Sequence, residues 1–523
     1  MTISTRTWAP WVSGGLCAMW TFVAWLSVIP NQDILVDGIQ AQSLVIDPRI
    51  VLAFPGQKHG GPLEYPATVF LEWLLPGNIY ANAVIRIPLA FITGYVTGRL
   101  AFRLFPETRA WALLTAVAVG PTIIHGLQPP GVWWLQPNYD MAWLLVTSGA
   151  LVIASGPTIE VADQSNQHRG LVRSFVAGLL VGLGLFAHPV IILLAVPLGV
   201  LVFLITRIRT RQMVLLFAGV GLGLLPAMAS YFINDEVNVW DPSHKPFIYP
   251  AWLWNMGRRA LGLDGIPDPA TALFPYALGF SPTQVPFNGL FQSIVVACLL
   301  GVALLVSIVG VYRSARVRIW LTPSTALALT WVVAAGTMVA FITSADPVSH
   351  YSAGLAPLFW ISIGALPGLI PVQPLGSVIT VLVLLSSAAS TWGQNFSYLT
   401  NLPERISGKA EYQEALLQSA ELLHKKDVEV IYGSYLDAVP IGYASNWKLR
   451  TVSINYNRFP LSSDEQQQDS YQVAVRTDGQ DGPAIEALAR VTAECDISSE
   501  TIDLPVGAFA VADCPTSALI QSE

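Results

Sequence analysis

The ionisable residues that could do chemistry are concentrated in one stretch near the N-terminus of a chain that otherwise avoids charge. They are Asp33, Asp37, Lys58, His59 and Glu64. Three of them belong to GQKHGGPLEYP (residues 56–66), where glycine and proline predict an irregular loop whose polar side chains can face water or a ligand. A carboxylate there could remove a proton from a hydroxyl group, while nearby cations could stabilise a departing anion.

The elements that position this loop follow from composition. Hydrophobic residues make up 53% of the chain and charged residues only 12%, and apolar runs of about 20 residues recur along it. We therefore predict an α-helical polytopic membrane protein, because a helix satisfies its own backbone in hydrocarbon. About eleven spans are expected. They cover roughly 8–30, 80–104, 109–126, 139–155, 171–187, 190–206, 213–234, 288–311, 322–344, 351–370 and 376–392.

The basic residues predict the orientation. The first span follows Arg6 and has no small-residue cleavage site, which indicates a retained anchor. With the N-terminus in the cytoplasm, basic residues favour the inner side roughly two to one. An odd number of spans then places the C-terminus outside. The expected location is the plasma membrane, crossed many times.

The composition changes near residue 400. Residues 401–523 contain 19 Asp and Glu against 9 Lys and Arg, and they mix helical and strand patterns. We predict a transmembrane domain over 1–400, with outer loops at 31–78 and 235–287, and a soluble extracytoplasmic α/β domain over 401–523. Because this domain would lie in an oxidising compartment, Cys495 and Cys514 are a candidate disulfide.

The first outer loop allows both functional and purely structural interpretations. Asp37 lies in ILVDGIQAQSLVI, whose pattern predicts an amphipathic helix along the membrane surface; the aspartate could also simply cap that helix. Glu64 could orient a substrate or pair with Lys58 or Arg86. Arg86 lies inside the second expected span, so it could bind an anion or the loop carboxylates, or extend to the interface. Asp140 could extend the site from the fourth span, and His188 is expected to be structural.

Several segments together resemble the GT-C superfamily, polytopic membrane glycosyltransferases that use polyprenyl-phosphate sugars. Asp37 fits the acidic position soon after the first span, and GQKHGGPLEYP resembles a bacterial variant with a Gly-Gly-x-Leu-Glu core. The other segments are ANAVIRIPLAFITGYVTGRLAFRLF, GLLVGLGLFAHPVIILLAVPLG, GLGLLPAMASYFIND, HYSAGLAPL and VEVIYGSYLDAVPIGYASNWKL.

The resemblance implies an inverting transfer of a sugar from a polyprenyl-phosphate donor to a cell-envelope acceptor, which is a glycan, a glycolipid or a protein. Asp37 would be the general base. The chain departs from the superfamily in lacking its acidic pair, since Gly38 follows Asp37, so the base could be Asp37, Asp33 or Glu64. Expected substrate contacts are Lys58, His59, Arg86, His350, Tyr351, Arg258 and Arg259.

Other ligands have weaker support. The histidines and cysteines lack short metal-ligand spacing, so no metal site or required cofactor is expected, although the loop carboxylates could hold a divalent ion. No basic patch with interleaved aromatic residues indicates nucleic-acid binding, and the expected partners are membrane lipids and the two substrates. Two alternatives to an enzyme are a flippase or transporter of lipid-linked glycans and a non-catalytic glycan-binding membrane scaffold.

Overall fold

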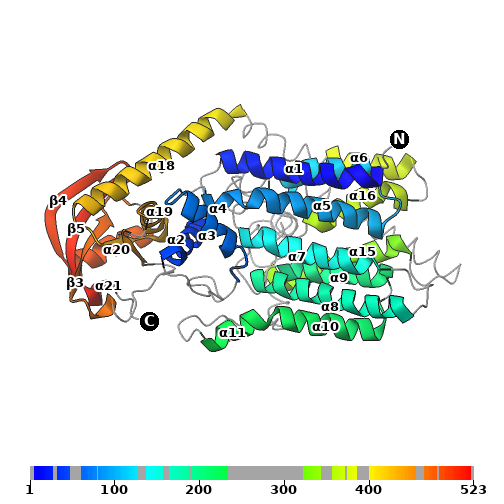
Figure 1. Ribbon diagram of the computed structural model, residues 1–523. Coiled ribbons are helices and arrows are strands. Elements are labelled where there is room, and N and C mark those ends of the chain that lie inside the picture. Colours follow the sequence, from blue (N-terminus) through cyan, green and yellow to red (C-terminus); the bar gives the residue numbers. More distant parts are fainter. Residues whose placement is uncertain are drawn as a thin grey trace, which may run out of the picture.

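The structure is a computed structural model. It describes residues 5–27, 32–46, 61–78, 81–125, 137–156, 164–188, 191–206, 208–233, 322–342, 356–370, 374–385, 400–446, 448–454, 465–479 and 482–519. Within these ranges a bundle of long helices lies beside a smaller part that carries the strands (Figure 1).

Helices occupy the expected spans that fall within the described ranges. They are α1 (Thr5–Ser27), α5 (Arg86–Leu104), α6 (Ala110–His125), α7 (Pro137–Ala154), α8 (Gln164–Ala187), α9 (Ile192–Thr206), α10 (Thr210–Gly223), α11 (Leu225–Ile233), α15 (Pro323–Ile342), α16 (Ala356–Leu369) and the helix Pro374–Leu385. Two described helices, Thr5–Leu26 and His168–Ala187, are by themselves long and apolar enough to cross a membrane, and several shorter apolar helices accompany them. The expected span at 288–311 lies outside the described residues, and the number of crossings stays a prediction.

Proline divides two of the expected spans. The second consists of α4 (Ala81–Val84) and α5, and Pro88 lies in the first turn of α5, where its missing N–H and its ring prevent a continuous helix through Val84. Arg86 is therefore the first residue of α5 and does not lie inside a longer helix, as the sequence had suggested. Pro226 has the same effect between α10 and α11.

Glycines bring α8 and α10 unusually close together. A Cβ atom on Gly178 would lie 1.9 Å from the carbonyl oxygen of Leu216, and one on Gly219 would lie 2.2 Å from that of Phe175. Such small residues allow two helix backbones to pack directly, as is common between membrane helices.

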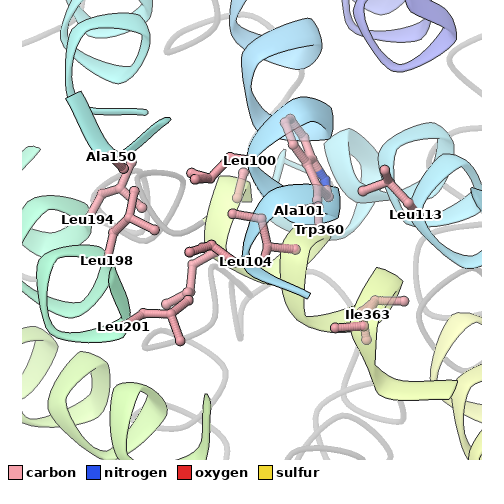
Figure 2. Close-up of a cluster of buried hydrophobic side chains, with 14 of the residues drawn as sticks. Leu100, Ala101, Leu104, Leu113, Ala150, Leu194, Leu198, Leu201, Trp360 and Ile363 are labelled. Atoms are coloured by element: carbon pink, nitrogen blue, oxygen red, sulfur yellow. The ribbon is translucent and has the colours of Figure 1, made fainter. Parts of the chain in front are cut away.

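Leucine, alanine and aromatic side chains fill the centre of the bundle. Figure 2 shows Leu100, Ala101 and Leu104 of α5 next to leucines of α9 and side chains of α16. This core fixes the helices whose loop-facing ends carry the polar residues described below.

The smaller part contains a mixed five-stranded sheet in the order β2-β1-β3-β5-β4. β1 (Val430–Gly433) pairs in parallel with β2 (Arg450–Ser453) and β3 (Ser470–Arg476), whereas β5 (Gly507–Pro515) runs antiparallel to β3 and β4 (Asp496–Leu504). The associated helices are α18 (Leu402–Lys425), α19 (Tyr435–Ala444), the short η3 (Glu465–Gln467), α20 (Gly482–Glu494) and α21 (Thr516–Leu519).

Alternating side chains bury both faces of this sheet. Val430 and Tyr432 share a core with α20, while Ile431 faces the core formed with α18 and α19. The stretch VEVIYGSY is a strand only as far as Gly433, because Ser434 precedes α19 and its hydroxyl group bonds Asp437. The structure contains a disulfide between Cys495 and Cys514, the candidate pair, with Cα atoms 4.5 Å apart.

The first loop lies between the bundle and the sheet. It contains α2 (Gln32–Ile46), α3 (Tyr65–Leu74) and α4, which Figure 1 shows next to α19 and near the starts of α5 and α7. The loop that carries the candidate site thus contacts both parts of the molecule.

Candidate active site at the loop end of the helical bundle

Asp37 is 1% exposed, and every side chain from Leu35 to Leu44 is buried. Protein covers this helix, and its course along the membrane surface stays a prediction. Its apolar residues Leu35, Val36 and Ile39 belong to the same core as α18, α19 and the sheet. An amphipathic pattern identifies an apolar face but does not say whether lipid or protein covers it.

Glu64 is the second buried carboxyl group of the loop. It is 1% exposed, immediately precedes α3, and neither of its carboxyl oxygens has a hydrogen-bond partner among the described residues. Burial raises the pKa of Glu64 to about 8 from its usual value of 4.5, because the charged form loses its hydration. Glu64 is therefore mostly protonated at neutral pH and can donate a hydrogen bond.

Tyr65 lies close to both carboxyl groups. Burial raises the pKa of its phenol well above the usual value, and the nearby negative charges of Asp37 and Glu64 raise it further. The sequence did not indicate a role for Tyr65, although it directly follows Glu64. Asp37 and Glu64 thus both lie near one buried tyrosine.

The glycines of GQKHGGPLEYP explain how Glu64 reaches this position. The backbone N–H of Gly61 donates to the carbonyl oxygens of Phe186 (2.6 Å) and Ala187 (3.3 Å) at the end of α8. A Cβ atom at Gly61 would lie 2.3 Å from the ring of Phe186, so a larger residue here would force that ring to shift. Glu64 then begins the turn into α3, where its carbonyl oxygen accepts from the N–H of Thr68.

Arg86 pairs with Asp140. Its Nε donates to Asp140 Oδ2, and the two side chains are 1% and 5% exposed. One terminal nitrogen of Arg86 (Nη1) has no hydrogen-bond partner among the described residues. Next to Asp140, the ring of Tyr139 stacks on buried His188, with centroids 3.9 Å apart. Arg86 thus forms its described ion pair with Asp140 of α7. It does not pair with Glu64 of the loop, which the sequence had suggested as a partner.

Several candidates cannot be placed. The candidates that lie outside the described residues are Lys58, His59, Arg258, Arg259, His350 and Tyr351. Asp33 is in α2, but its side chain is outside the description. Among the described residues, no group of three or more His, Cys, Asp and Glu could hold a metal ion.

An open apolar groove of about 450 Å³ lies elsewhere, between Trp111 of α6 and the helix Pro374–Leu385. The candidate site residues do not line it.

A polar contact between the loop and α19 was not evident from the sequence. Tyr443 of α19 donates its hydroxyl hydrogen bond to buried Glu72 of α3. Glu72 is the one charged residue of the apolar helix YPATVFLEWL, a signal that could have indicated a buried polar partner.

No protein-family model matches this chain, and no curated protein sequence matches it. The chain is similar to the crystal structure of ArnT from Cupriavidus metallidurans bound to undecaprenyl phosphate, with a TM-score of 0.55, 10% sequence identity, and coverage of 99% of this chain and 100% of that one. For ArnT from the same organism in the apo state the TM-score is 0.53 and the identity 12%, covering 96% and 97% of the two chains.

A third structure is the archaeal oligosaccharyltransferase AglB from Archaeoglobus fulgidus in complex with an inhibitory peptide and a dolichol-phosphate. Its TM-score is 0.41 at 10% identity, covering 84% of this chain and 63% of that one.

The similarity to ArnT defines the fold. The chain shares the fold of these ArnT structures over nearly its whole length, a likeness that agrees with the resemblance noted in the sequence. It is mostly helical, with its described strands confined to residues 430–515.

Proposed function

We propose that this chain is a membrane glycosyltransferase that transfers a sugar from a polyprenyl-phosphate donor to a hydroxyl group of a cell-envelope acceptor. The observation that carries the proposal is the burial of Asp37 and Glu64 around Tyr65 in the first loop of a GT-C fold. The donor class is supported by the undecaprenyl phosphate bound to ArnT, since undecaprenyl phosphate is a polyprenyl phosphate.

In this mechanism Asp37 is the general base. As the acceptor oxygen attacks the anomeric carbon, its proton passes to Asp37, the bond between that carbon and the phosphate oxygen breaks, and polyprenyl phosphate leaves with the bonding electrons. Attack from the face opposite the leaving group inverts the anomeric configuration. Glu64, protonated at neutral pH, donates a hydrogen bond that orients the acceptor.

Arginine and other cations stabilise the departing phosphate in this scheme. The buried Nη1 of Arg86 is available for such a contact among the described residues, and Asp140 holds the guanidinium from its other side. The further proposed donor contacts are Lys58, His59, Arg258, Arg259, His350 and Tyr351. Asp33 is the alternative base. The scheme uses no metal or other cofactor.

The proposed setting is the outer face of the plasma membrane. Eleven spans with the N-terminus inside would place the loop 31–78 and the domain 401–523 outside. The disulfide of Cys495 and Cys514 supports this placement, because such bonds persist in oxidising compartments.

The test is sugar transfer by the purified full-length protein in lipid, with radiolabelled polyprenyl-phosphate sugars as donors. Replacing Asp37 with Asn keeps the size of the side chain but removes the base, so we expect turnover to fall about 10²- to 10⁴-fold. Full transfer by Asp37→Asn would remove Asp37 as the base. Movement of the lipid-linked sugar between leaflets without transfer would instead favour a flippase.

A further inference from the structure

The sheet-containing part of the molecule determines where the helix of Asp37 lies. The main described neighbours of α2 are α3, α4 and α19, and not the long helices of the bundle. On either side of Asp37, Val36 and Ile39 are fully buried in a core that also contains Leu416 of α18 and Val439 of α19. The position of Asp37 therefore depends on contacts made by residues about 400 positions away in the sequence.

Four residues connect the loop to α19 through hydrogen bonds, and we call them the latch: Gln42, Glu72, Asn78 and Tyr443. The Tyr443 hydroxyl contacts Glu72 Oε1 and the carbonyl oxygen of Asn78, the latter at 2.9 Å. The amide of Gln42 donates to the carbonyl oxygen of Tyr443 (3.2 Å) and to Glu72 Oε2 (3.3 Å). Tyr443 and Glu72 are 0% and 1% exposed, so water does not replace these bonds easily.

Tyr443 lies in a helix that packs closely against the sheet. A Cβ atom at Gly442 would lie 1.8 Å from Thr451 Oγ1, so this turn of α19 packs directly on β2. The sheet part is itself attached to the bundle, because Nζ of Lys409 donates to the carbonyl oxygen of Trp25 near the end of α1 and lies 4.9 Å from the centre of the Trp25 ring. The sheet part thus links the end of α1 to the loop.

We propose that Tyr443 is a positioning residue through which the C-terminal sheet part holds α2, and with it Asp37, in its catalytic place. This inference rests on the proposed function. It gives the C-terminal part a role in organising the active site, in addition to any contact with the acceptor. Because α2 has few other described neighbours, loosening the latch displaces Asp37 without removing any group that touches the substrates.

The experiment compares Tyr443→Phe with Tyr432→Phe in the full-length protein in lipid nanodiscs. Both tyrosines are buried in the same part of the molecule, but Tyr432 lies in the core on the α20 side of the sheet, away from the loop. The first measurement is amide hydrogen exchange of residues 35–44. We expect about tenfold faster exchange in Tyr443→Phe, since a buried acceptor loses its hydrogen bond, and no change in Tyr432→Phe.

The second measurement is steady-state transfer. Tyr443→Phe should lower kcat about 10- to 100-fold and leave the donor KM unchanged, because small displacements of a catalytic group slow the chemical step. Glu72→Gln should keep near-normal kcat, since it retains a carbonyl acceptor of the same length, whereas Glu72→Ala should behave like Tyr443→Phe. Such conservative rescue is not expected from a general loss of stability.

Unchanged exchange over 35–44 in Tyr443→Phe would overturn the proposal, and so would equal effects of the two Phe substitutions. If Tyr443→Phe does not fold, Gln42→Leu tests the latch from the loop side, because it removes the bonds to the Tyr443 carbonyl oxygen and to Glu72 Oε2. If the wild-type protein transfers no sugar, the exchange measurement still decides whether the latch holds α2, and only the proposed function fails.

Discussion

At the scale of single residues, the buried carboxyl groups of the loop, Asp37 and Glu64, are unusual. Carboxyl groups avoid apolar surroundings unless they are paired or protonated, yet Glu64 has no described hydrogen-bond partner for its side chain. Its raised pKa is the physical response to this burial. An orphaned group at a loop that begins a helix and adjoins a second carboxyl group is best explained by a ligand that completes its hydrogen bonds.

This raised pKa predicts a pH dependence. Transfer should be highest at neutral pH and fall as the pH rises through about 8, because Glu64 then loses the proton that it donates. Glu64→Gln, which always has a donor, should stay active and lose this alkaline decline. The measurement is a pH profile of kcat for both proteins.

Exposed Glu421 provides the control for that profile, since Glu421→Gln should keep the wild-type decline. The same pKa shift affects stability. Because burial raises the pKa of Glu64 above its unfolded value, its contribution favours the folded state at low pH and is lost as the pH rises through about 8. An alkaline decline that persists in Glu64→Gln would contradict the role assigned to Glu64.

Arg86 and Asp140 are a different case at the same scale. Each is almost completely buried, and the attraction between them offsets part of the cost of removing both charges from water. Pairing of this kind fixes the guanidinium at the start of α5 while leaving one of its nitrogens for another acceptor. The pair therefore serves both the packing of α5 against α7 and the proposed phosphate contact.

At the scale of elements, the site depends on how closely α8 can approach its neighbours. The end of α8 accepts the hydrogen bonds of Gly61, so any shift of α8 also moves the turn that carries Glu64. Glycines on α8 and α10 allow these two helices to pack backbone against backbone.

We expect Gly178→Ala to destabilise the protein, because its new Cβ atom would lie within 1.9 Å of a backbone oxygen on α10 and the helices would have to separate. The expected loss is about 1–3 kcal/mol, measured as a lower unfolding temperature in detergent. Gly221→Ala is the matched control on α10, where no atom lies within 4 Å of the added Cβ, and it should be neutral or slightly stabilising. Equal effects of the two substitutions would show that close packing is not the cause.

At the scale of the whole molecule, the helical bundle and the sheet part form one functional unit in this interpretation. The stability of the sheet then affects the loop through α19. The disulfide joins Cys495, which immediately precedes β4, to Cys514 in β5, closing a loop with a sequence separation of 19.

Reducing this disulfide should destabilise the sheet part by about 3 kcal/mol, because the unfolded chain regains the freedom of the closed loop. The measurement is the unfolding temperature of the full chain with and without reductant. Reductant should lower the unfolding temperature of both wild type and Cys17→Ala, since Cys17 is a buried free thiol in α1. The double variant Cys495→Ala/Cys514→Ala should have the lower unfolding temperature with or without reductant. A further decrease with reductant in that variant would refute the assignment of the effect to this disulfide.

The amino-acid sequence by itself determined the helical class, the approximate positions of the long helices, the change of architecture near residue 400 and the loop in which to look for chemistry. Each follows from local properties, because apolar length, glycine and proline act within a few turns of the chain. The resemblance in the sequence also pointed to the fold that the likeness to ArnT shows.

Only the tertiary structure decided which groups meet. It placed Tyr65 near both Asp37 and Glu64, paired Arg86 with Asp140, and packed the helix of Asp37 against the C-terminal sheet part. The physical reason is that burial and ion pairing depend on contacts between segments far apart in sequence. Tyr443 and Glu72, which are 371 residues apart, illustrate this: nothing in either local sequence specifies the other.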